Sequence, residues 1–207
     1  MIEYIHRFVP ATDAYAPTLV ALHGTGGDEA DLIPLARAIH PGAAVLSPRG
    51  RVLEHGKPRF FARLSEGVFD QEDLARRTIE LADFIAWAAE RYGFDPRRVY
   101  AVGYSNGANI AASVLLARSE SLAGGVLFRA MVPFEPEALP DLSGKAVFIS
   151  AGRADPMVPA SNTQRLADLL ARAGAKVRLV WQETGHGLLS PEVDQAAEWF
   201  VRASARA

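Results

Sequence analysis

The chain has no cysteine among its 207 residues. Disulfides, thiolate metal sites and a cysteine nucleophile are therefore excluded. No run approaches the roughly 18 apolar residues that a membrane-spanning helix needs, and the first residues, MIEYIHRFVPATDAY, lack the charged leader and apolar run of a signal peptide. We therefore expect a soluble cytoplasmic protein with no membrane partner.

The chain also lacks a strong charge of either sign. It carries 22 Lys and Arg against 24 Asp and Glu, a formal net charge of -2. A balance this close to neutral gives no electrostatic argument for binding nucleic acid or an acidic membrane surface. No His, Asp and Glu residues have the spacing of metal ligands, so we expect no catalytic metal and no cofactor. The length suits one domain over residues 1–207, and a homodimer stays open.

What the chain does have is a regular alternation of apolar runs and amphipathic segments. Apolar runs predict strands at Tyr4–Val9, Thr18–His23, Ala43–Ser47, Arg98–Gly103, Gly125–Phe128, Ala146–Ala151 and Lys176–Trp181. Helical periodicity predicts helices at Asp28–Ile39, Asp70–Tyr92, Asn106–Arg118, Ser161–Ala173 and Pro191–Ala203. This alternation predicts an α/β fold in three layers, with helices on both faces of a mostly parallel sheet of about seven strands.

Local signals refine this arrangement. The first strand meets the second through a short link, Pro10–Pro17, and is expected to be the antiparallel one. Ser161 is a candidate helix cap, Gly174 a helix end, and Pro191 stands where a first helical turn tolerates proline. The longest irregular stretch runs over residues 48–69. A loop of that length is usually functional or mobile, and this one is either a surface loop with aromatic anchors or a pocket wall.

The segment Gly103-Tyr104-Ser105-Asn106-Gly107 joins a predicted strand to a predicted helix. In a sharp strand-to-helix turn the serine backbone lies close to its neighbours, which explains glycines two residues away on each side. Ser105 is then a nucleophile exposed at the end of the strand. The alternative is a serine that caps the helix in an ordinary turn.

Other reactive residues follow other strands. Asp155 comes after the sixth predicted strand, His186 after the seventh, and the glycine-rich segment HGTGGDEAD begins at the end of the second. Ligands of parallel sheets bind beyond the carboxyl ends of the strands. We therefore expect these residues to meet at one edge with Ser105, together with Arg129, Met131 and Phe134 after the fifth strand.

A serine, a histidine and a carboxylate at one edge are what acyl transfer requires. Histidine removes the serine proton during attack, and a carboxylate behind the imidazole fixes its tautomer. The backbone N–H groups of Thr25 and Asn106 are placed to stabilise the oxyanion, and the chain order Ser105, Asp155, His186 is that of α/β-hydrolases.

Alternatives to these assignments remain. Asp155 precedes Pro156 and is otherwise a turn-forming residue, in which case Asp141 or Glu183 competes as the acid. His23 is expected to be a structural hydrogen-bonding residue, with substrate contact as the lesser option.

The segments LVALHGTGGDEADLIPLA, LSPRG, VGYSNGANIA, SAGRADPMVP and GHGL resemble the phospholipase/carboxylesterase branch of the α/β-hydrolase superfamily. The bacterial esterases linked to hydroquinone resistance are more similar than the acyl-protein thioesterases, which usually carry glutamine where this chain has Asn106. Dienelactone hydrolases share the fold but typically use a cysteine nucleophile. The resemblance implies a serine esterase that needs no cofactor.

The chain is too short to hold a separate cap domain. We therefore expect a shallow site roofed by residues 48–69 and 131–140, with His23, Phe60, Phe61 and Met131 as pocket candidates. Such a site favours short-chain or small aromatic esters. An acyl-protein thioesterase or lysophospholipase is the alternative within the class, and a ligand-binding protein without activity is the alternative outside it.

Overall fold

A computed structural model describes residues 4–205 of the chain. Its central seven-stranded sheet has the spatial order β1 (His6–Val9), β3 (Ala44–Pro48), β2 (Thr18–Leu22), β8 (Val99–Tyr104), β9 (Gly124–Phe128), β10 (Ala146–Gly152) and β11 (Lys176–Gln182). Every neighbouring pair is parallel except β1 with β3. The predicted α/β class and mostly parallel sheet are confirmed.

The antiparallel strand is the first one, as predicted. It pairs with β3, and not with β2, which is the next strand along the chain. His6 lies opposite Pro48, and Val9 lies opposite Val45. The reason is the character of the two strands. All five residues of β2 are buried, whereas β1 is only partly buried. A strand that is apolar along its whole length takes an interior position in a sheet covered on both faces, and the more polar β1 takes the edge.

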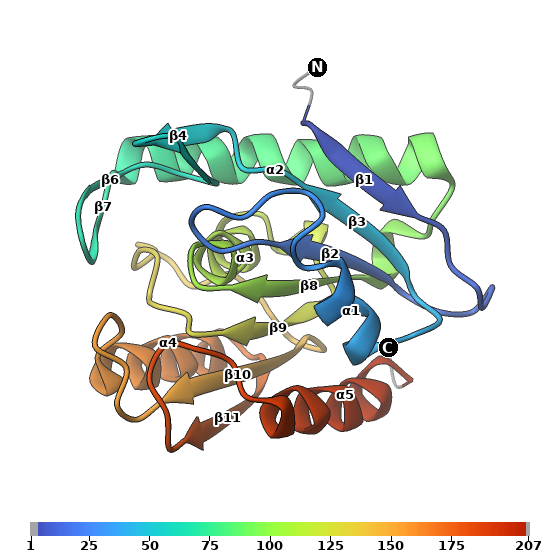
Figure 1. Ribbon diagram of the computed structural model, residues 1–207. Coiled ribbons are helices and arrows are strands. Elements are labelled where there is room, and N and C mark those ends of the chain that lie inside the picture. Colours follow the sequence, from blue (N-terminus) through green and yellow to red (C-terminus); the bar gives the residue numbers. More distant parts are fainter. Residues whose placement is uncertain (1–3, 206–207) are drawn as a thin grey trace.

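Helices cover both faces of the sheet, so the three-layer arrangement is also confirmed. The α1 and α5 helices pack on one face, and the α2, α3 and α4 helices pack on the other (Figure 1). Their bounds are α1 Ile33–Ile39, α2 Gln71–Tyr92, α3 Asn106–Ala117, α4 Ala160–Arg172 and α5 Ser190–Ser204, with single 3-10 turns at Pro96–Arg98 and Ser119–Ser121. Among the helices within residues 4–205, none is both long enough and apolar enough to cross a membrane.

The helix ends follow local chemistry with two corrections. Asp70 caps α2 by accepting a hydrogen bond from the backbone N–H of Asp73, and Gly174, at φ 98°, follows the end of α4. The predicted cap at Ser161 is wrong, because α4 begins at Ala160 with Pro159 in the cap position. The α1 helix covers only the second half of its predicted range, because residues before Ile33 form turns.

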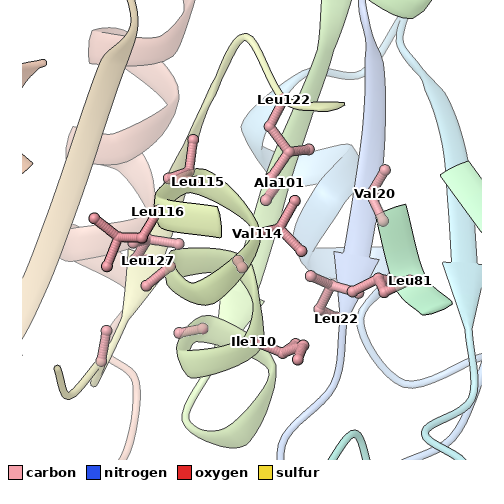
Figure 2. Packing of buried hydrophobic residues seen from close by; sticks show 14 of the residues in the cluster. Val20, Leu22, Leu81, Ala101, Ile110, Val114, Leu115, Leu116, Leu122 and Leu127 are labelled. Carbon is pink, nitrogen blue, oxygen red and sulfur yellow. The ribbon is translucent and has the colours of Figure 1, made fainter. Parts of the chain in front are cut away.

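The α3 helix is the central element of the core. Its residues from Asn106 to Leu116 are all buried, as expected of a helix that is apolar on every side. Ile110 and Val114 pack toward β2 and β8, and Leu115 and Leu116 pack toward β9 (Figure 2). The turn that precedes α3 is therefore held by the best-packed part of the protein.

The stretch over residues 48–69, predicted to be irregular, folds into two hairpins. The first pairs β4 (Val52–Glu54) with β5 (Lys57–Arg59), and the second pairs β6 (Arg63–Ser65) with β7 (Val68–Phe69). The turn of the first hairpin has φ 51° at His55 and φ 78° at Gly56. Two successive positive φ angles are the signature of a tight hairpin turn. This segment extends over the carboxyl ends of the central strands.

Candidate active site

The turn between β8 and α3 holds Ser105 in a strained conformation. Its backbone has φ 53° and ψ -115°, a region that non-glycine residues rarely adopt. A Cβ atom on Gly107 would lie 1.9 Å from the carbonyl oxygen of Leu22, and one on Gly103 would lie 2.7 Å from the Cα of Ala108. The steric need for glycine at both positions, predicted from the motif, is confirmed.

The ends of three strands bring Ser105, His186 and Asp155 into one hydrogen-bonded line. The Ser105 hydroxyl lies 2.9 Å from His186 Nε2, and His186 Nδ1 lies 2.7 Å from Asp155 Oδ2. Since the carboxylate accepts from Nδ1–H, the lone pair of the neutral imidazole is at Nε2 and accepts from the serine hydroxyl. This is the arrangement in which a histidine can remove a proton from serine.

The Asp155 carboxylate is fixed from behind. Its side chain is 1% exposed, and its Oδ1 accepts hydrogen bonds from the backbone N–H groups of Met157 (2.8 Å) and Val158 (3.1 Å). The two competing acids lie elsewhere. Asp141 accepts from the N–H of Ser143, and Glu183 is 84% exposed in an ion pair with Arg153.

Thr25 and Asn106, the two predicted oxyanion donors, line the same cavity as Ser105. The N–H of Asn106 belongs to the first turn of α3, where it has no partner within the helix and where the helix dipole favours an anion. The side-chain oxygen of Asn106 accepts the N–H of Phe60 at 2.7 Å. Thr25 lies in the turn after β2, and its hydroxyl accepts from Arg59 Nη1 at 2.6 Å.

The cavity beside Ser105 is small and partly open to solvent. Met131 forms part of its wall, as predicted. The other wall residues include Arg59, Arg63, Glu66, Phe69, Asn109, Met157 and Val158.

Three predicted pocket residues do not line this cavity. His23 is buried behind it, where its Nδ1 donates to the carbonyl of Gly24 and its Nε2 accepts the N–H of Gly50. Phe60 and Phe61 point into the core instead, and the ring of Phe61 meets the edge of Phe69, with centroids 4.9 Å apart. Burial lowers the pKa of His23, in agreement with a neutral structural residue.

Two cations on the cavity wall were not predicted from the sequence. The Arg59 side chain is 3% exposed and donates to the carbonyl of Phe61 as well as to Thr25. Burial and the nearby charge of Arg63 lower the pKa of Arg59. Glu54 contacts both guanidinium groups, at 3.3 Å and 2.8 Å. The basic residues of the 48–69 stretch were the available signal in the sequence. Which of them face the cavity depends on how the two hairpins pair and pack.

Comparison with known proteins assigns this architecture to a class. Residues 19–205 match the dienelactone hydrolase family, and the chain belongs to that family. A Bacillus subtilis protein described as a hydrolase, MhqD, is 51% identical over 185 residues, which is 89% of this chain and 92% of that protein. The chain therefore belongs to the α/β-hydrolases of esterase type.

Solved structures agree. A Bacillus cereus carboxylesterase superposes with a TM-score of 0.94 at 49% identity, covering 96% of this chain and 93% of that one. The structure of YahD with malic acid superposes with a TM-score of 0.90 at 32% identity, covering 98% and 100% of the two chains.

Proposed function

We propose that the protein is a serine carboxylesterase that hydrolyses small carboxylic esters through an acyl-enzyme. The observation that carries this proposal is the unbroken hydrogen-bonded line from Ser105 through His186 to Asp155 at the edge of the cavity. A ligand-binding protein without activity, the alternative from another class, has no use for a serine held at a strained backbone angle against a histidine.

The proposed reaction has two halves. His186 Nε2 takes the hydroxyl proton as Ser105 Oγ attacks the ester carbonyl, and the N–H groups of Thr25 and Asn106 bind the oxyanion. The imidazolium, paired with Asp155, gives its proton to the departing alcohol, which leaves the acyl group on Ser105. His186 then removes a proton from water, whose oxygen attacks the acyl carbon, and returns it to Ser105 as the acid is released.

The size of the cavity favours a short acyl group. The cavity is small and partly open to solvent, which suits a short acyl group better than a long one. The long acyl groups of acyl-protein thioesterase or lysophospholipase substrates exceed the space of this cavity. Turnover of a palmitoyl thioester above that of a butyryl ester would reverse this preference.

Arg59 and Arg63 on the cavity wall favour an acyl group that ends in an anion. Arg59 and Arg63 share one carboxylate, that of Glu54, and guanidinium groups pair well with carboxylates. One structural neighbour, YahD, was solved with malic acid, a dicarboxylic acid. We expect mono-4-nitrophenyl glutarate to be a better substrate than 4-nitrophenyl butyrate, and Arg63→Gln to reduce that advantage.

Labelling with a fluorophosphonate tests the serine mechanism directly. The probe forms a covalent bond with an activated serine, and mass spectrometry of the labelled peptide identifies the residue. We expect the label on Ser105 and turnover of 4-nitrophenyl butyrate. Folded protein that acquires no label and hydrolyses no ester would contradict the proposal and favour the binding protein.

A further inference from the structure

A guanidinium group is completely buried beside the loop that carries His186. Arg129 follows the end of β9, at φ 58°, and its side chain is 0% exposed. It forms an ion pair with Glu192 of α5, which is also 0% exposed. Arg and Glu side chains are almost never fully buried unless they are paired. The contacts around this buried pair therefore need an explanation.

All five N–H donors of Arg129 have acceptors. Nε donates to the carbonyl of Gly185 at 3.1 Å, and Nη2 donates to the carbonyl of Gly187 at 2.6 Å. Nη2 and Nη1 also donate to the two carboxylate oxygens of Glu192, at 2.6 Å and 2.8 Å. The remaining donor of Nη1 reaches the carbonyl of Ser150 at 3.2 Å.

These contacts lie on both sides of His186. The carbonyls of Gly185 and Gly187 accept from Arg129, and the carbonyl of His186 itself accepts from the hydroxyl of Tyr104 at 3.0 Å. A Gly-His-Gly segment has unusual conformational freedom because its glycines have no Cβ atom. Three consecutive carbonyls held by side chains remove that freedom where the histidine must be aligned.

Glu192 connects this contact to the next helix. Its Oε1 accepts the backbone N–H of Leu189 at 2.7 Å, and its Oε2 also accepts the hydroxyl of Ser150. The ion pair therefore joins the ends of β9 and β10, the His186 loop and the first turn of α5. Every polar atom of the pair is satisfied, which a buried charge requires.

Stability alone is a weak reason for such a pair. Removing two charges from water is costly, and apolar residues of similar volume often replace a buried ion pair with no loss of stability. A planar guanidinium supplies what apolar residues cannot, which is a rigid set of donors that reaches the carbonyls on either side of one residue.

We propose that Arg129 and Glu192 are positioning residues that align His186 with Ser105 and Asp155. This inference rests on the proposed esterase function. Neither side chain takes part in the chemistry, because both act through the backbone of the loop. A misplacement of about 1 Å can reduce catalysis about 100-fold, so loss of the pair is expected to lower kcat and to leave KM nearly unchanged.

The test uses Arg129→Lys, Glu192→Gln and the apolar double variant R129M/E192L, with Arg165→Met as control. Arg165 forms an exposed ion pair with Glu135, and neither residue belongs to the loop that carries His186. For each variant, kcat and KM for 4-nitrophenyl butyrate are measured beside the thermal unfolding midpoint. We expect the double variant to unfold near the wild-type temperature while kcat falls about 100-fold, and Arg165→Met to match wild type.

Two outcomes would overturn the inference. One is a double variant that keeps both the wild-type kcat and the wild-type unfolding midpoint, because the pair would then not be needed to align His186. The other is unchanged hydrogen exchange of residues 183–190 in that variant, because the loop would then not depend on the pair. A wild-type protein that is inactive and takes no fluorophosphonate label would instead contradict the proposed function, and the exchange measurement would still decide whether the pair holds the loop.

Discussion

The Cα atom of Gly107 lies directly against the carbonyl of Leu22, so closely that a Cβ atom would come within 1.9 Å of its oxygen. This contact joins the first turn of α3 to the end of β2. It therefore places Asn106, the residue after Ser105, beside the loop that carries Thr25. The same close approach that requires glycine brings together the two backbone segments proposed to bind the oxyanion.

Gly107→Ala is therefore expected to be among the most damaging single-methyl changes in the protein. The methyl group has no space between α3 and β2, and we expect a loss above about 4 kcal/mol in the free energy of unfolding, or a failure to fold. Gly187→Ala is the matched control, because within residues 4–205 its added Cβ would meet no atom within 4 Å beyond those of its chain neighbours. Thermal unfolding compares the two, and equal midpoints would contradict the steric argument.

Ser105→Ala is expected to abolish ester hydrolysis with little change in stability. The hydroxyl donates to His186 Nε2 at 2.9 Å, and its loss removes the nucleophile while the Cβ atom and the backbone stay as they are. In other serine hydrolases such a change lowers kcat by about 10⁶-fold. The measurement is turnover of 4-nitrophenyl butyrate beside thermal unfolding. Retained turnover in the folded variant would mean that another residue is the nucleophile.

Asp155→Asn is expected to lower kcat by about 10⁴-fold. The asparagine amide can turn its NH2 group toward Nδ1 and so favour the tautomer of His186 that carries its proton on Nε2, which cannot accept the serine proton. Glu183→Gln and Asp141→Asn test the two acids that compete from sequence alone, and both are expected to leave kcat unchanged. A larger loss in either of these than in Asp155→Asn would move the acid to that position.

The sequence was enough to predict that Ser105, Asp155 and His186 lie together, because their placement follows from strand ends. Apolar runs locate buried strands, and parallel strands bring their carboxyl ends to one edge regardless of what the side chains do there. Ser105, Asp155 and His186 could be placed together on that basis alone. The glycines of the turn could be explained in the same way, because their role is steric.

The rest depended on contacts between distant segments. The direction in which Phe60 and Phe61 point is decided by packing of the hairpins on the core, and no periodicity in such a short segment shows it. Arg129 could be placed at the active edge, but its partner Glu192 is 63 residues away on α5. The pairing of β1 with β3 likewise depends on which strand is apolar enough for the interior.

The buried histidine beside the oxyanion loop predicts a pH-dependent stability. His23 donates from Nδ1 to the carbonyl of Gly24 and accepts at Nε2 from the N–H of Gly50. Protonation at Nε2 would point its N–H at the N–H of Gly50, so that two hydrogen-bond donors would face each other. In agreement, burial lowers the pKa of His23 from its ordinary value of 6.5, so below that pH the unfolded chain takes up a proton that the folded chain does not.

The free energy of unfolding is therefore expected to fall as the pH drops below about 6.5, until the lower pKa of the folded state is reached. His23→Gln removes this proton uptake. Its free energy of unfolding is expected to be lower at pH 7.5 and to change less between pH 7.5 and pH 5.5. His55→Gln is the matched control, since His55 is exposed in a hairpin turn and is expected to keep the wild-type slope. Denaturant unfolding at several pH values gives the three slopes, and a His23→Gln slope equal to wild type would show that this histidine does not couple stability to pH.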